Sequence, residues 1–262
     1  MKITKYLFPL FIILLLVTKS YSDDFSDAML KAKLDLKKAT DTYDEKALLK
    51  VRGEYERILQ LKKDQWLVYY YMAYVDYNLS YTGVKDNDIN KDIVKKYTIS
   101  GLDMIDKSTS INPDFGDAYV LQLALTFSRW MYEQDKMTEI MSASTQANET
   151  AKKLDPDNPR YHLINGTSMF YTPEMFGGGV DKALKEYDKS YELFKTRKEK
   201  EDYYPDWGKD LICGYLALAY IKRGDDGDMA KAKNFIDEGL KINPDCGFIK
   251  SYVQKQYNEK EK

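Results

Sequence analysis

A five-residue pattern typical of helix ends, SINPD at 110–114, recurs as KLDPD at 153–157 and KINPD at 241–245. In each copy an apolar residue precedes Asn or Asp, followed by Pro and Asp. Proline lacks the N–H that a helix needs and clashes with the preceding turn, so each copy predicts the end of one helix. The Asp after the proline is then expected to cap the next helix. Three copies indicate an internal repeat of helix pairs.

Small side chains recur before these prolines. The residues five, eight and twelve positions earlier are Ser108, Ile105 and Gly101; Ala151, Asn148 and Ser144; and Gly239, Ile236 and Ala232. Helix positions three, four or seven apart share one face. The small residues therefore predict a shallow strip on which a neighbouring helix can pack closely.

The starts of helices repeat as well. PDFG at 113–116, PDWG at 205–208 and PDCG at 244–247 share one entry pattern. Apolar periodicity between these signals predicts an all-α chain of about five helix pairs and a C-terminal capping helix. The expected helices are 24–39, 43–62, 65–81, 91–110, 115–132, 136–154, 159–171, 180–196, 206–223, 228–242 and 246–258.

The repeated unit resembles the tetratricopeptide repeat (TPR) family, whose helix pairs carry aromatic and small residues at set positions. The resemblance implies an α-solenoid, a single domain over 23–258 in which each pair packs on its neighbours and the first helices line a concave face. The matching residues are Leu216, Ala217, Tyr220, Gly224, Ala232, Ile236, Gly239 and Pro244 in the last unit, and His162, Gly166, Ala183, Tyr187 and Ser190 in an earlier one.

The N-terminus has the form of a secretory signal peptide. Two lysines precede an uncharged run at 6–18, and SYS at 20–22 supplies small residues for cleavage. The run is shorter than the roughly 20 residues that cross a bilayer. We therefore expect residues 1–22 to be removed rather than kept as an anchor, and the mature chain to have no transmembrane segment. The protein is expected to be exported, to the periplasm or out of the cell, with a charged tail at 259–262.

Charge and cysteine content narrow the range of partners. The chain has 40 Lys and Arg against 42 Asp and Glu, a net charge of −2, and loss of the signal removes three of the lysines. Basic residues are scattered among acidic ones, so the counterion release that drives nucleic-acid binding is missing and no nucleic acid is expected. The two cysteines, Cys213 and Cys246, are expected to be separate buried thiols, although export leaves pairing open.

The sequence has no motif of a common catalytic or metal site. A single histidine, His162, cannot supply a two-imidazole site, and Cys-x-x-Cys, zinc-protease and serine-elbow motifs are absent from the sequence. DNDINKD at 86–92 alternates oxygen side chains, but Lys91 replaces the glycine of a calcium loop and Tyr97 its closing glutamate. We expect a polar linker there, and no enzyme activity, metal or cofactor.

The stretch YTPEMFGGG at 171–179 is the most distinctive part of the sequence. It lacks the Gly-Lys-Ser/Thr of a phosphate loop, so it is expected to be either a widened turn plugged by Phe176 or a loop overhanging the mouth of a groove. With Lys182 and Ala183 it resembles exported bacterial TPR proteins, including the periplasmic component associated with TRAP transporters. That resemblance implies an alternative role as a small-molecule-binding or assembly component of a transporter.

Tyrosines recur at spacings of 4, 3 and 4 between positions 70 and 81. A stripe at this spacing serves helix packing or a binding groove. We expect a non-enzymatic scaffold that binds a peptide or protein partner along its concave face, with a small-molecule ligand as the alternative. The sequence does not determine the oligomeric state. The expected ligand contacts are Tyr71, Tyr74, Arg129, Arg160, Tyr171 and Lys222.

Overall fold

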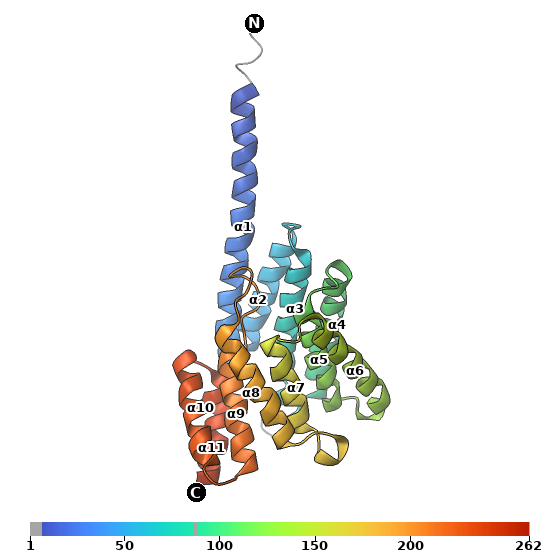
Figure 1. Cartoon of the computed structure of the whole chain (residues 1–262). Helices are drawn as coiled ribbons and strands as arrows, with labels where there is room; N and C mark the ends of the chain where they lie inside the picture. Colours follow the sequence, from blue (N-terminus) through green and yellow to red (C-terminus); the bar gives the residue numbers. More distant parts are fainter. Residues whose placement is uncertain (1–6, 86–87, 262) are drawn as a thin grey trace.

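The computed structural model describes residues 7–85 and 88–261, and within them the fold is all-α apart from one two-stranded hairpin (Figure 1). The α-helices are α1 (Leu7–Thr42), α2 (Glu45–Leu59), α3 (Gln65–Tyr81), α4 (Lys91–Ile111), α5 (Gly116–Ser128), α6 (Met137–Leu154), α7 (Pro159–Tyr171), α8 (Val180–Thr196), α9 (Lys209–Arg223), α10 (Asp228–Ile242) and α11 (Gln254–Glu261). The short elements are β1 (Val84–Lys85), β2 (Asp88–Ile89), the 3-10 turns η1 (Arg129–Met131), η2 (Gln134–Lys136) and η3 (Glu174–Phe176), and the π-helix η4 (Phe248–Val253). The expected all-α repeat fold is confirmed.

The helix ends follow the proline pattern. Helices α4, α6 and α10 end at Ile111, Leu154 and Ile242, each directly before the Asn or Asp that precedes proline. The expected capping by the following Asp was wrong. Phe115 occupies the N-cap position of α5, and α7 is capped by Asn158, whose side-chain oxygen accepts the N–H two residues on at 2.9 Å.

Successive helices pack as pairs, with α3 on α4, α7 on α8 and α9 on α10. Small residues lie at these contacts as expected. A Cβ placed on Gly101 would lie 2.9 Å from Leu125, and one on Gly239 would meet Ile249 and, at 3.0 Å, the Cβ of Cys213. The absence of a side chain therefore allows the close approach of neighbouring helices.

We predict that Gly166→Ala destabilises the protein while Gly53→Ala stabilises it. The new methyl group of Gly166→Ala would lie 2.6 Å from the buried ring of Tyr187, and such overpacking costs about 1–3 kcal/mol, against a helix-propensity gain of about 1 kcal/mol. At Gly53 the nearest atom belongs to the Arg57 guanidinium group, at 3.6 Å, so alanine meets no obstacle there and brings only the gain in helix propensity. Urea unfolding of both variants checks the difference in sign.

The N-terminal half of α1 projects away from the rest of the molecule (Figure 1). Within the described residues no helix is both long enough and apolar enough to span a membrane. Residues 1–6 of the expected signal peptide lie outside the described part, and α1 runs unbroken across the expected cleavage position. Removal of residues 1–22 stays a prediction.

The buried apolar side chains form two clusters that meet at α7. The first holds side chains of α1 to α6 together with Tyr161 and Ile164, and the second holds side chains of α7 to α10 and of η4. Trp207, in the segment between α8 and α9, packs against both clusters. The fold thus has an N-terminal half and a C-terminal half joined by α7 and by this segment.

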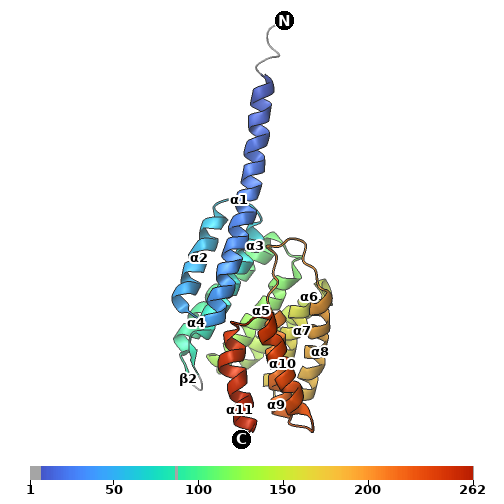
Figure 2. The same cartoon turned by 90° about the vertical axis from the view of Figure 1, so that its left-hand side faces the viewer.

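The two ends of the solenoid also meet. We expected each helix pair to touch only its neighbours, but the C-terminal end of α1 lies beside the last helices (Figure 2). The side chain of Asn243, after α10, donates to Asp41 at 2.8 Å and to Asp210 at 2.7 Å. Gly247 packs so closely on the backbone of Asp41 that a Cβ would collide with it. This junction joins the two ends of the fold.

Candidate functional site

Residues 197–208, here called the crossing segment, run across the inner face of the N-terminal half. The hydroxyl of Tyr71 donates to the carbonyl of Tyr203 at 2.7 Å. The Trp207 indole N–H donates to the hydroxyl of Tyr70 at 2.8 Å, and its ring stacks on Tyr74 with centroids 4.9 Å apart. This part of α3 is therefore covered by the protein's own chain.

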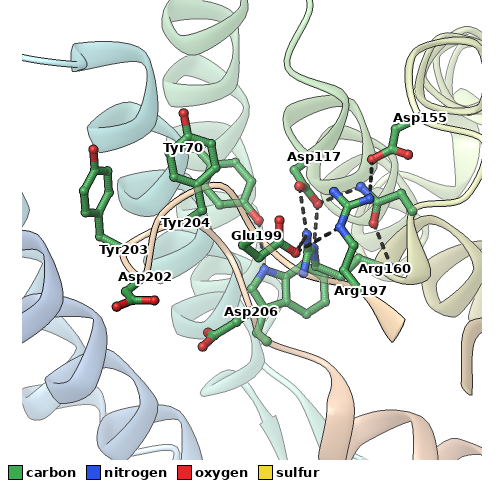
Figure 3. A network of polar contacts seen from close by, with 12 residues as sticks. Tyr70, Asp117, Asp155, Arg160, Arg197, Glu199, Asp202, Tyr203, Tyr204 and Asp206 are labelled. Carbon is green, nitrogen blue, oxygen red and sulfur yellow. Dashed lines mark hydrogen bonds and ion pairs between the residues drawn. The ribbon is translucent and has the colours of Figure 1, made fainter. Parts of the chain in front are cut away.

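A buried charge network holds the start of the crossing segment (Figure 3). The guanidinium of Arg160 is fully buried and donates to both oxygens of Asp117, at 2.6 and 3.0 Å, and to Glu199 at 2.8 Å. Arg197 binds Asp155 at 2.8 Å and Glu199 at 3.2 Å. Although burial alone would lower it, the charge and hydrogen bonds of Asp117 raise the pKa of Arg160. The positive charge of Arg160 is thus paired with carboxylates inside the protein.

A cavity of ≈ 420 Å³ opens between α1 and the start of α9, and we call it the α1–α9 cavity. Its rim includes apolar side chains that stay exposed to water, namely Leu30 and Leu34 of α1 and Ile242 at the end of α10. Buried and half-buried aromatic side chains also line it, namely Tyr71, Tyr74, Trp207 and Phe248.

Both signs of charge occur around this cavity. Lys33 is engaged with the crossing segment through the carbonyls of Asp202 and Tyr204 and the carboxylate of Asp206, at 2.6, 2.8 and 2.9 Å. Lys37 and Lys209 are exposed where they line the cavity.

Two of the four carboxylates at the cavity are held by one amide. Asp41 and Asp210 share the amide of Asn243, and burial raises the pKa of Asp41. Asp202 and Asp206 also line the cavity and are exposed. Lys33, Lys37 and Lys209 are the cationic residues among the lining residues.

Two rows of aromatic rings continue from the cavity along α3 and along α9 with η4. On α3, Tyr77 and Tyr81 lie with ring centroids 5.1 Å apart. On the other side, Tyr215 contacts Phe248 at 4.8 Å, and Phe248 stacks on Tyr252 at 6.1 Å. Burial, together with the nearby Tyr81 and Tyr215, raises the pKa of Tyr77 well above its usual range.

A second cavity of ≈ 440 Å³, the α9–α11 cavity, lies at the other end of α9. The ammonium group of Lys222 donates to the carbonyl of Phe170 at 2.9 Å and lies 4.3 Å from the centre of its ring. The cavity is lined by Phe170, Leu218, Ile221, Lys222, Tyr252, Gln256, Glu259 and Lys260.

The expected ligand contacts are divided among several places. Tyr71 and Tyr74 line the α1–α9 cavity, and Lys222 lines the α9–α11 cavity. Tyr171 is half exposed at the end of α7, while Arg129 lines neither cavity and is paired with Glu133 and Glu139. Arg160 is buried in its own network, so a ligand reaches it only if the crossing segment moves. Sequence reasoning missed Leu30, Leu34, Ile242 and Phe248.

The expectation that Phe176 plugs the turn at 171–179 was wrong, because its side chain is 73% exposed. The single histidine and the two cysteines are buried. His162 contacts Glu186 at 2.6 Å and the carbonyl of Pro156 at 2.9 Å, and Cys213 and Cys246 are both buried and free. Of the expected linker 86–92, residues 86–87 lie outside the described part, β2 follows, and Asn90 caps α4. Among residues 7–85 and 88–261, no group of three or more His, Cys, Asp and Glu is placed to hold a metal ion.

Comparison with known proteins identifies the type of fold. No family model and no curated protein matches the chain. The HusA haemophore from Porphyromonas gingivalis is similar in structure, with a TM-score of 0.60 and 24% identity, covering 72% of this chain and 92% of the haemophore. A thermophilic TPR protein from Thermus thermophilus, TTC0263, matches with a TM-score of 0.57 and 14% identity over 88% of this chain and 98% of its own. The fold is therefore a TPR-like helical repeat.

Proposed function

We propose that this protein is a non-enzymatic binding protein that holds a compact, largely apolar ligand with an anionic group in the α1–α9 cavity. The observation that supports this most is the cavity itself. Its volume of ≈ 420 Å³ is in the range of small-molecule sites, and its walls are mainly apolar and aromatic. The proposal thus takes the small-molecule alternative, because the crossing segment fills the part of the groove expected to bind a peptide.

The chemistry of the rim supports this ligand class. Leu30, Leu34 and Ile242 keep apolar surface in water, and each would gain about 25 cal/mol for every Å² that a ligand covers. Lys37 and Lys209 supply positive charge close to that apolar surface. A molecule with an apolar body and a carboxylate would satisfy both features.

Haem is the first ligand to test, because it is planar, mostly apolar and carries two propionates, and because a haemophore shares the fold. The cavity offers no histidine among its lining residues. Burial raises the pKa of Tyr74, and burial beside Asp210 raises the pKa of Cys246 to about 12, which disfavours the anionic form of both side chains. We therefore propose that stacking and apolar contact, rather than iron coordination, would hold the ring.

Metal-free protoporphyrin IX is accordingly predicted to bind about as tightly as haem, within roughly threefold, in absorbance titrations. Leu34→Asp should weaken the binding of both porphyrins by about tenfold or more. The new carboxylate would replace an apolar side chain of the cavity and repel the propionates. Leu49→Asp is the matched control, because Leu49 is similarly exposed on α2 (45% against 53%) and lines neither cavity. Absence of porphyrin binding, or a hundredfold preference for haem, would contradict the proposal.

A peptide or protein partner is the second candidate. Three main-chain carbonyls of the crossing segment accept hydrogen bonds from Lys33 and Tyr71, and an extended peptide is bound through contacts of this kind. If a peptide used the same cavity, saturating protoporphyrin should displace it. We further propose, from the signal-like N-terminus, that the protein acts outside the cytoplasm, and fractionation of cells tests that.

A further inference from the structure

The α9–α11 cavity carries a separate inference, because its shape and charges differ from those of the α1–α9 cavity. Its floor consists of Phe170, Leu218 and Ile221, which are only 7%, 5% and 5% exposed. They come from two helices, α7 and α9. The other lining residues include Tyr252 of η4 and Gln256 of α11. The cavity is therefore a slot between helices with an apolar floor and a polar rim.

Charge at the rim of this slot is mainly positive. Lys222 and Lys260 line it together with one carboxylate, that of Glu259. One N–H of the Lys222 ammonium group is used by the Phe170 carbonyl, which leaves two donors. The ammonium group is also held over the Phe170 ring, at the edge of the apolar floor. Apolar surface and a fixed cation are thus adjacent.

The geometry separates this slot from the first cavity. Lys209 and Lys222 are at opposite ends of α9, thirteen residues apart, which corresponds to about 20 Å along the helix. The π-helix η4 connects the two places, since Phe248 lines the first cavity and Tyr252 the second. Turns of π-helix occur frequently at functional sites.

We propose that the α9–α11 cavity binds the alkyl chain of a long-chain carboxylate, with the chain over Phe170, Leu218 and Ile221 and the carboxylate on Lys222 and Lys260. The apolar floor fits methylene groups, and the two lysines complement one negative charge. This inference does not rest on the proposed function. It holds or fails whether or not the α1–α9 cavity takes a porphyrin.

Calorimetric titration of the full chain with decanoate and dodecanoate, below their micellar concentrations, tests the site. Dodecanoate should bind saturably and more tightly than decanoate, by up to about 15-fold for two extra methylenes. Lys222→Met and Lys260→Met should each weaken binding by roughly threefold to fivefold, and Glu259→Gln should tighten it. Lys241→Met, on α10 and outside both cavities, is the control and should leave binding unchanged.

A blocking variant locates the bound chain. Gln256→Trp places a large ring in the slot from a partly exposed position of α11, so it should abolish dodecanoate binding while leaving the melting temperature and porphyrin binding unchanged. The proposal is overturned if dodecanoate does not bind, if Gln256→Trp binds it normally, or if both lysine variants bind it as the wild type does. It is also overturned if Leu34→Asp, in the other cavity, abolishes binding.

Discussion

Replacing Asp117 by alanine is expected to lower the free energy of unfolding by about 3–5 kcal/mol. Asp117 accepts two hydrogen bonds from the buried guanidinium of Arg160 and one, at 3.0 Å, from the amide of Asn158. The variant leaves a buried positive charge that only Glu199 partly balances. Because Glu199 belongs to the crossing segment, we expect the substitution to destabilise both halves of the fold.

Urea unfolding followed by circular dichroism measures this effect, with Asp103→Ala as the matched control. Asp103 pairs with Lys107 at 2.7 Å on the exposed surface of α4, and such a pair contributes about 0–1 kcal/mol. A loss at Asp117 no larger than that at Asp103 would show that the Arg160 network does not hold the crossing segment in place.

Trp207→Ala is the second substitution with a large expected effect, about 3 kcal/mol or more. The indole packs against both apolar clusters, stacks on Tyr74 and donates to the hydroxyl of Tyr70. Its removal takes away the main aromatic contact between the crossing segment and α3. We also expect the α1–α9 cavity, which Trp207 lines, to become larger.

Trp207→Phe separates the two contributions of the indole. Phenylalanine keeps a ring on Tyr74 but loses the donor to Tyr70, whose hydroxyl is buried, so the expected loss is only about 1–2 kcal/mol. Thermal unfolding of the two variants should therefore rank wild type above Trp207→Phe and Trp207→Phe above Trp207→Ala. Equal stability of Trp207→Ala and wild type would contradict the bridging role.

The helices could be predicted from the sequence because their signals are local. The expected helix at 180–196 coincides with α8 and that at 228–242 with α10, since apolar periodicity, glycines and the Asn-Pro pattern mark their ends. The crossing segment could not be predicted. Its course depends on contacts such as that of Lys33 with Asp202 and Tyr204, which are far apart in sequence and leave no periodic trace.

The candidate site was predicted only where it lies on one helix. Tyr71 and Tyr74 belong to a tyrosine-rich helix that the sequence singled out, and both line the α1–α9 cavity. Leu34 and Ile242 carry no motif in the sequence, and they line one cavity only because the two ends of the fold come together. Arg160 was chosen for its charge, but a fully buried guanidinium needs partners of its own, and Asp117 and Glu199 supply them.

Methyl NMR spectra with protoporphyrin IX test the central claim most directly, because the ring current of a bound porphyrin shifts nearby methyl signals. We predict large shifts for Leu30, Leu34, Leu211 and Ile242, which line the α1–α9 cavity, and none for Ile105 or Leu121 in the N-terminal core. Saturable binding that leaves these four residues unshifted, or that shifts Leu218 and Ile221 instead, would contradict the account.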